Sequence, residues 1–166
     1  MRTAVALGSN LGDRLGNLRA ARKAILGLAN VKAPSLRSAV YETEPVSCEP
    51  GAAKFLNAVI EFDYKCDAVG LLEQLIDIEG ALGRKRDHPK NVSRIIDIDL
   101  LYCGNQQINS ERLQLPHPRM HLRKFVLQPL ADICPTLILP TQTTAVRELL
   151  KQWQESAGVV RFTDDW

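Results

Sequence analysis

The residues best suited to chemistry are two aspartates, Asp97 and Asp99, inside the apolar segment RIIDIDLL at residues 94–101. Segments this rich in Ile and Leu are typical of buried β-strands. Because strand side chains alternate between the two faces of a sheet, both carboxylates point the same way, roughly 6–7 Å apart at the backbone. Hard divalent cations prefer oxygen ligands, and paired metals in phosphoryl-transfer sites lie about 3.5–4 Å apart. The segment therefore predicts a site where two divalent cations could be held against the phosphates of a nucleotide; the alternative is an edge strand whose outer face is simply solvated.

Basic residues gather just upstream of the aspartates. Five of them lie within eleven positions, while the net charge of the whole chain is only +2. A nucleic-acid-binding protein usually shows a markedly basic balance, so the cluster favours a local anion site over a polyanion surface. It supplies the positive charge that a nucleotide triphosphate would need: Arg84, Lys85, Arg86, Lys90 and Arg94.

Such a triphosphate would have to be held by side chains. The chain contains no Gly-x-x-x-x-Gly-Lys-[Ser/Thr] motif, and residues 8–12 lack the Gly-x-Gly-x-x-Gly spacing. Arginine offers planar, bidentate donors that suit phosphate oxygens, although a single arginine is more often a solvated surface charge. The arginines considered are Arg84, Arg86, Arg94 and Arg123.

Three further residue types deserve a functional interpretation. His117, fixed between two prolines, is placed to donate to a phosphate; the same prolines argue against a helical zinc pair with His121. Asn57 is an amide inside a predicted strand, and a buried amide needs partners, of which a heteroaromatic ligand is one. Phe55 and Phe125 are equally compatible with the core.

The composition describes a soluble globular protein with 45% hydrophobic and 24% charged residues. Its four cysteines are widely spaced and include no Cys-x-x-Cys, so neither zinc binding nor redox pairing is indicated and a cytoplasmic setting is expected. No apolar run reaches transmembrane length, and the apolar part of residues 1–8 is too short for a signal peptide. We therefore expect no membrane partner.

The hydrophobic periodicity predicts a single domain over residues 1–166. Strands are expected at 3–8, 36–43, 55–64 and 94–102, with hairpin character at 103–108. Helices are expected from 14 to 29, with Asp13 as cap, then from 67 to 82, 124 to 133 and 144 to 156, followed by a short tail. This order predicts an α+β fold: a ferredoxin-like βαββαβ core with additional C-terminal helices in three αβα layers.

With these residues collected, the chain resembles the 6-hydroxymethyl-7,8-dihydropterin pyrophosphokinase family of the folate pathway. The strand motif Arg-x-x-Asp-[Leu/Ile]-Asp-Leu-Leu, followed about fifteen residues later by Pro-His, is highly specific in this combination. The resemblance covers essentially the whole chain, through the segments Gly8-Ser9-Asn10, YETEP at 41–45, Phe55-Leu56-Asn57, Gly83-Arg84, 94–101, 109–113, Pro116-His117 and 120–130.

The resemblance implies transfer of pyrophosphate from ATP to the pterin hydroxymethyl group, with release of AMP. It implies that Asp97 and Asp99 hold two magnesium ions. The implied phosphate contacts are Arg84, Arg94, His117 and Arg123, with Arg86 on a loop that closes over the site. The implied pterin contacts are Thr43, Val46, Phe55, Asn57 and Phe125. ATP and the pterin are thus the expected partners, and a monomer that binds no nucleic acid is expected.

Two departures from the family pattern leave rival interpretations open. Asn91 and Val92 stand where the family often has an aromatic and a small residue, which would fit a degenerate member retained for interaction or regulation. Two other departures lie elsewhere in the chain. Phe55 replaces a frequent tyrosine, and Ile76 replaces a polar residue three positions before Glu79. Glu79 is therefore only a weak site candidate. A ferredoxin-like RNA-binding module is disfavoured, because only 5% of residues are aromatic and paired aspartates repel phosphate.

Overall fold

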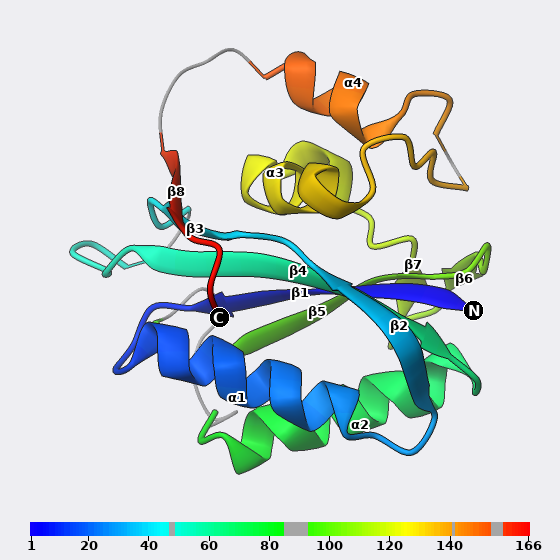
Figure 1. Ribbon diagram of the computed structural model, residues 1–166, viewed down its shortest axis with the longest axis horizontal. Helices are drawn as coiled ribbons and strands as arrows, with labels where there is room; N and C mark the ends of the chain where they lie inside the picture. The colour runs from blue at the N-terminus through cyan, green and yellow to red at the C-terminus, as the bar shows by residue number, and fades with distance from the viewer. Residues whose placement is uncertain (47–48, 85–92, 141, 154–157) are drawn as a thin grey trace.

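The computed structural model describes residues 1–46, 49–84, 93–140, 142–153 and 158–166, and these residues form one large antiparallel sheet between layers of helices, with a small two-stranded sheet beside it (Figure 1). The six-stranded sheet has the order β5-β1-β4-β3-β8, and β2 also pairs with β4. Every pairing in it is antiparallel. The strands are β1 (Arg2–Ser9), β2 (Val31–Arg37), β3 (Val40–Thr43), β4 (Phe55–Tyr64), β5 (Asp97–Cys103) and β8 (Val159–Thr163).

Helices cover both faces of the sheet. The helices α1 (Arg14–Leu26) and α2 (Ala68–Ala81) lie on one face, and α3 (Lys124–Ile133) and α4 (Val146–Lys151) lie on the other (Figure 1). Asp13 and Asp67 cap the first two helices, since their side chains accept from the N–H groups three residues on. The predicted α+β ferredoxin-like fold with three layers is confirmed.

The central strands separate two hydrophobic clusters. On β4, Leu56, Ala58, Ile60 and Phe62 pack in the cluster with α1 and α2, whereas Val59 packs with α3. The register between β1 and β5 shifts after Ala4, at a bulge. Alternate residues face α3 on either side of the bulge, whereas at the bulge the consecutive residues Leu101 and Tyr102 of β5 both pack in the cluster with α3.

The segment predicted as one strand at 36–43 is two strands, β2 and β3. The break has a physical reason in the polar contacts of Ser38 and Ala39. The Ser38 hydroxyl accepts from the Val59 N–H at 2.9 Å, and the Ala39 N–H donates to the Asp132 carboxylate on α3 at 3.1 Å. These bonds take the place of regular ladder bonds at this point.

Other boundaries differ from the expected ones. The helix expected to 29 ends at Leu26, the strand expected from 94 begins at Asp97, and the last helix covers only Val146–Lys151. The hairpin lies further along the chain than 103–108: β6 (Ile108–Asn109) pairs with β7 (Gln114–Leu115), followed by a 3-10 helix at Met120–Leu122. The short C-terminal tail contains β8, for which no strand was predicted, and Trp166 is buried, donating from its indole to the Ser38 carbonyl at 2.8 Å.

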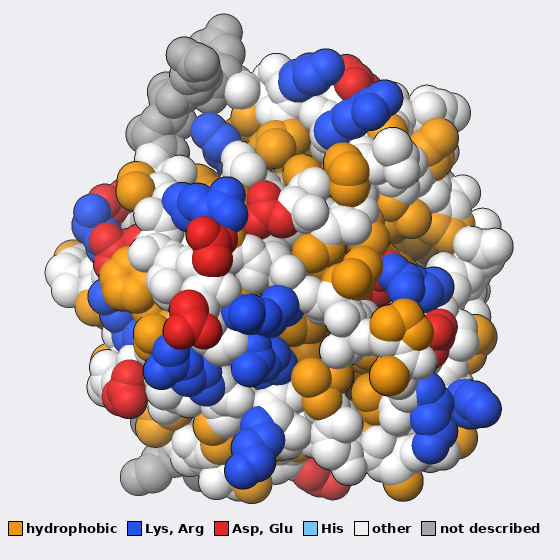
Figure 2. Space-filling model, viewed as in Figure 1, with side chains coloured by type: hydrophobic (Ala, Val, Ile, Leu, Met, Phe, Trp, Pro, Cys, Tyr) orange, Lys and Arg blue, Asp and Glu red, His pale blue; other side chains and the backbone are white. Residues whose placement is uncertain are grey.

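The surface carries both signs of charge. On the face shown in Figure 2, basic and acidic side chains are interspersed and form no continuous basic surface. Within the part of the chain that the structure describes, no helix has both the length and the apolar character needed to cross a bilayer.

Candidate active site

The candidate site is built on one row of residues across the sheet. Gly8 on β1 lies opposite Asp97 on β5 and opposite Asn57 on β4. Cross-strand partners share a face, so the carboxylate and the amide rise on either side of a residue without a side chain. A Cβ at Gly8 would lie 3.0 Å from the Asn57 Oδ1 atom. The next residue of β1 on this face, Ala6, is opposite Asp99 and is also small. Small residues on β1 thus leave a hollow between the two polar groups.

A cavity of about 250 Å³ opens above this row. It is lined by residues from β1, β3, β4 and β5, from the start of α3 and from the segments flanking the sheet. Its lining contains four arginines, three acidic residues and two phenylalanines, with the neutral residues Ala6, Leu7, Gly8, Thr43, Val46 and Asn57 between them. The combination of cations, carboxylates and aromatic faces suits a ligand that is anionic at one end and planar at the other.

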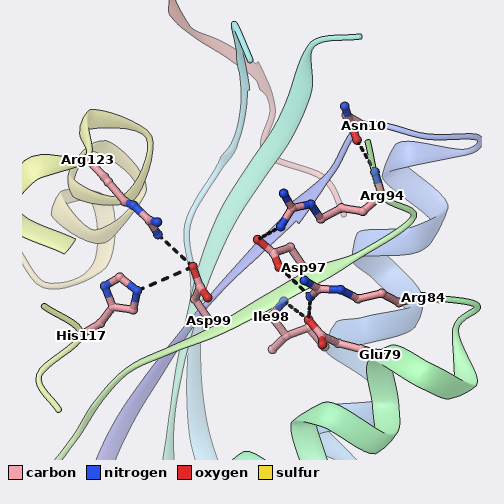
Figure 3. A network of polar contacts seen from close by, with 9 residues as sticks. All are labelled: Asn10, Glu79, Arg84, Arg94, Asp97, Ile98, Asp99, His117 and Arg123. Carbon is pink, nitrogen blue, oxygen red and sulfur yellow. Dashed lines mark hydrogen bonds and ion pairs between the residues drawn. The ribbon is translucent and has the colours of Figure 1, made fainter. Parts of the chain in front are cut away.

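Asp97 is held by two arginines. Its Oδ1 atom is 2.6 Å from Arg84 Nη1, and its Oδ2 atom is 3.0 Å from Arg94 Nη1 (Figure 3). Both arginines come from the segments that lead from α2 into β5. Basic residues upstream of the strand therefore meet the first of its two aspartates, and their role as an anion site stays a prediction.

Asp99 has its own cationic partner on the opposite side. Arg123 Nη1 lies 3.0 Å from Asp99 Oδ2, and His117 Nε2 lies 4.0 Å from the same atom (Figure 3). Burial lowers the pKa of His117 below its ordinary value of 6.5, against the raising effect of Asp99. His117 Nδ1 accepts from the Arg119 N–H at 3.2 Å, so in the neutral ring the proton sits on Nε2, which faces Asp99.

Glu79 on α2 is a buried carboxylate behind this network. It is ion-paired with Arg84 and accepts from the Ile98 N–H of β5 at 2.7 Å. Burial raises the pKa of Glu79 above its ordinary value, against the lowering effect of Arg84. Glu79 was only a weak candidate from the sequence, although one signal was available: it follows Leu71 and Leu75 at four-residue spacing on the buried face of α2.

The two phenylalanines belong to the same cavity. The Arg94 guanidinium lies 6.0 Å from the ring centre of Phe55, and that of Arg123 lies 5.6 Å from the ring of Phe125. Asn57 donates to the Thr43 hydroxyl at 2.7 Å, which fixes its amide with Oδ1 on the side of Gly8. The aromatic faces and a fixed amide therefore lie next to the arginine–aspartate network.

The sequence-predicted residues come together with two exceptions. The cavity is lined by Thr43, Val46, Phe55, Asn57, Arg84, Arg94, Asp97, Asp99, Arg123 and Phe125, as the assignments require. His117 lies beside Asp99 at the border of that lining, and Arg86 lies outside the described residues, as do Asn91 and Val92. The structure adds five lining residues to which the sequence gave no individual role: Ala6, Leu7, Gly8, Glu44 and Arg119.

The aspartate pair fits magnesium better than zinc. Among the described residues no group of three or more His, Cys, Asp and Glu side chains could enclose a metal ion. Magnesium is commonly bound by one or two carboxylates, with water and substrate phosphates completing its coordination. Two carboxylates that open onto one cavity match that ligand set. The three described cysteines are free and none lines the cavity.

Comparison with known proteins gives consistent matches over most of the chain. A family model described as 7,8-dihydro-6-hydroxymethylpterin-pyrophosphokinase matches residues 4–135. A 2-amino-4-hydroxy-6-hydroxymethyldihydropteridine pyrophosphokinase of Bacillus subtilis is 38% identical over 159 residues, covering 95% of this chain and 93% of the relative. An enzyme of the same name from Methylorubrum extorquens is 39% identical over 160 residues, covering 96% and 98%.

Solved structures show the same fold. The Plasmodium falciparum HPPK-DHPS with pterin and p-hydroxybenzoate superposes with a TM-score of 0.70 at 15% identity. The match covers 91% of this chain and 42% of that chain.

Proposed function

The chain belongs to the 7,8-dihydro-6-hydroxymethylpterin-pyrophosphokinase family, and on that premise we propose how the residues of its cavity carry out the reaction. It is an ATP-dependent pyrophosphokinase that transfers pyrophosphate to hydroxymethyldihydropterin in folate biosynthesis. The assignment of its residues is our proposal, supported above all by one observation: the arginine–aspartate network and the phenylalanines line a single cavity.

The phosphate half of the site consists of Arg84, Arg94, His117 and Arg123. In the structure three of these cations are occupied by the two aspartates. Magnesium bound to Asp97 and Asp99 would supply charge neutralisation at the triphosphate. Arginines that no longer compensate the carboxylates would then be available to phosphate oxygens, for which their planar donors are well suited.

The pterin half consists of Phe55, Phe125 and Asn57, with Thr43 and Val46 at its edge. Stacked or edge-on aromatic contacts suit a flat bicyclic ring, and each of these phenylalanines lies beside an arginine of the phosphate half. Asn57 would read the polar edge of the ring with an amide whose orientation Thr43 fixes.

The proposed chemical step is in-line attack of the pterin hydroxyl oxygen on the β-phosphorus of ATP, with AMP as the leaving group. A new bond forms between the pterin oxygen and the β-phosphorus. The bond from the β-phosphorus to the oxygen that bridges it to the α-phosphorus breaks, and the hydroxyl proton is lost to solvent. Arginines aimed at the phosphates stabilise charge in the transition state, which is the main catalytic contribution in phosphoryl transfer. Arg86, outside the described residues, is proposed to act mainly on the rate.

We propose that residues 1–166 act as one monomeric domain in the cytoplasm, with ATP and the pterin as partners and no nucleic acid or membrane. Charges of both signs are interspersed on the one face that Figure 2 shows, which supports the absence of a nucleic-acid surface on that face. The scattered cysteines, free where described, support a reducing compartment.

The assignments are tested by replacing Asp97 and Asp99 separately with Ala and titrating magnesium. If the carboxylates hold the metal, turnover falls by several orders of magnitude in each variant while pterin stacking is weakened far less. Equal and small losses in turnover and pterin affinity would refute a metal-ligand role.

A further inference from the structure

The side chain of Asn10 connects the segment that carries Arg94 to the segment that leads to Phe55. Asn10 follows β1 and is only 2% exposed. Its Oδ1 atom accepts from the Arg94 N–H at 2.7 Å (Figure 3). Its Nδ2 atom donates to the Ala53 carbonyl at 3.2 Å and to the Ser93 hydroxyl at 3.0 Å. All three partners belong to segments that lie beside the cavity and not to its own turn.

The first arm of this contact fixes Arg94. The backbone of Arg94 is held on both sides, because its carbonyl accepts from the Asn10 N–H at 3.2 Å while its N–H donates to the Asn10 side chain. Arg94 lies before β5 and outside any helix or strand. The contacts with Asn10 therefore set the point from which the Arg94 guanidinium reaches Asp97 and lies over Phe55.

The second arm fixes the segment that enters β4. Ala53 lies two residues before Phe55, so its bond to Asn10 holds the chain where the aromatic side chain emerges. The same two segments are linked again at Ser93. Its N–H and its hydroxyl both donate to Glu49 Oε1, at 3.0 and 2.5 Å.

We propose that Asn10 is a positioning residue that sets the separation between Arg94, on the phosphate side, and Phe55, on the pterin side. This inference rests on the proposed function of those two residues. An asparagine that only stabilised the connection between β1 and α1 would bond to residues of that connection, as Asn17 of α1 does: its Nδ2 atom donates to the Leu11 carbonyl at 2.9 Å and to the Ser9 hydroxyl at 3.2 Å.

The two arms can be broken separately. Asn10→Asp keeps an oxygen acceptor for the Arg94 N–H but faces the Ala53 carbonyl with a second oxygen, so it breaks the pterin arm. Asn10→Ala removes both arms. Asn17→Ala is the matched control, because it removes an asparagine of α1 whose two side-chain hydrogen bonds go to Ser9 and Leu11 and not to Arg94 or Ala53.

The experiment measures two dissociation constants, kcat and the melting temperature. The nucleotide probe is an ATP analogue with a methylene group between the α- and β-phosphates, and the pterin is titrated into enzyme saturated with that analogue. We expect Asn10→Asp to weaken pterin binding roughly tenfold, which is about the effect of one lost hydrogen bond. Binding of the analogue should weaken less than about threefold, because the hydrogen bond to the Arg94 N–H is kept. Asn10→Ala should weaken both roughly tenfold and lower kcat, while Asn17→Ala leaves both constants within about twofold.

The proposal is overturned if Asn10→Ala lowers the melting temperature but leaves both dissociation constants and kcat at the wild-type values. It is also overturned if Asn10→Asp weakens the analogue as much as the pterin. Should Asn10→Ala not fold, Asn10→Asp decides alone. Arg94→Ala and Phe55→Ala, measured in parallel, test the proposed site independently of Asn10. Wild-type affinities in these two variants would refute the proposed site, whatever the Asn10 variants show.

Discussion

Arg84 is ion-paired with the buried carboxylate of Glu79 as well as with an aspartate of the cavity. The same carboxylate accepts a backbone hydrogen bond from β5, between the two aspartates of that strand. Glu79 thus ties Arg84, which we propose binds phosphate, and β5, which carries the proposed metal ligands, to α2. Because Glu79 already orders the Arg84 side chain, Arg84 loses less conformational entropy when it binds a phosphate.

Replacing Glu79 with Gln should raise the KM for ATP and reduce kcat, because Arg84 loses the charge that orients it. The free energy of unfolding should fall by about 1–3 kcal/mol, the usual cost of disturbing a buried polar contact. Steady-state kinetics and urea unfolding check both values. Glu73→Gln is the control, since Glu73 lies on the same helix but is exposed and pairs with Arg112. Unchanged kinetics in Glu79→Gln, with only the stability lowered, would reduce Glu79 to a structural role.

The stability that Glu79 contributes should depend on pH. Burial raises its pKa above the ordinary value of 4.5, so the native protein keeps this proton at pH values where the unfolded chain has released it. The free energy of unfolding of wild type relative to Glu79→Gln should therefore fall as pH rises from 4.5 through the raised native pKa, and should be level above it. Urea unfolding at a series of pH values measures the difference. A difference that grows with pH would show the opposite shift.

Replacing Gly8 with Ala should weaken pterin binding roughly tenfold, a loss of about one well-made contact. The added Cβ would lie 3.0 Å from the Asn57 Oδ1 atom, so the amide has to move from the position that Thr43 fixes. Equilibrium titration with the pterin measures the loss. Gly80→Ala is the control, because a Cβ at Gly80 meets nothing within 4 Å. Equal pterin affinity in Gly8→Ala and wild type would exclude Asn57 as a pterin contact.

Arg119 should contribute to ATP binding more than to the rate. It is an exposed cation that lines the cavity, and within the described part of the chain its side chain has no ion pair. Arg119→Ala should raise the KM for ATP roughly threefold to tenfold at low salt and leave kcat within about twofold, because an exposed charge attracts phosphate in ground and transition states alike. Arg147→Ala on α4 controls for loss of a surface charge. A fall in kcat at unchanged KM would contradict this assignment.

Local patterns predicted most of the fold and singled out the aspartates and arginines of the cavity, whereas Thr43 and Val46 came only from the family resemblance. The alternation around Asp97 and Asp99 gave their common face, and the apolar spacing at 124–133 gave the bounds of α3 without error. Asp13 was recognisable as a cap because its helix begins directly after it. Each of these features depends on residues close together in the sequence, where propensity and periodicity act.

Long-range relationships were the ones that local patterns missed. The pairing of β8 with β3 joins residues more than 100 positions apart, and the local sequence at 159–163 does not indicate which strand it pairs with. The role of Gly8 depends on cross-strand register with β4 and β5, and that of Glu79 on contact between α2 and β5. Register and packing between distant segments are set by the whole core.

The most direct test of the account is AMP formation from ATP by the wild-type protein, with magnesium present and 6-hydroxymethyl-7,8-dihydropterin added or omitted. The account predicts one AMP for each pterin diphosphate, no AMP without pterin, and loss of both products when Asp97 is replaced with Ala. Formation of ADP instead of AMP, or unchanged AMP formation by the Asp97→Ala variant, would contradict diphosphoryl transfer at this cavity.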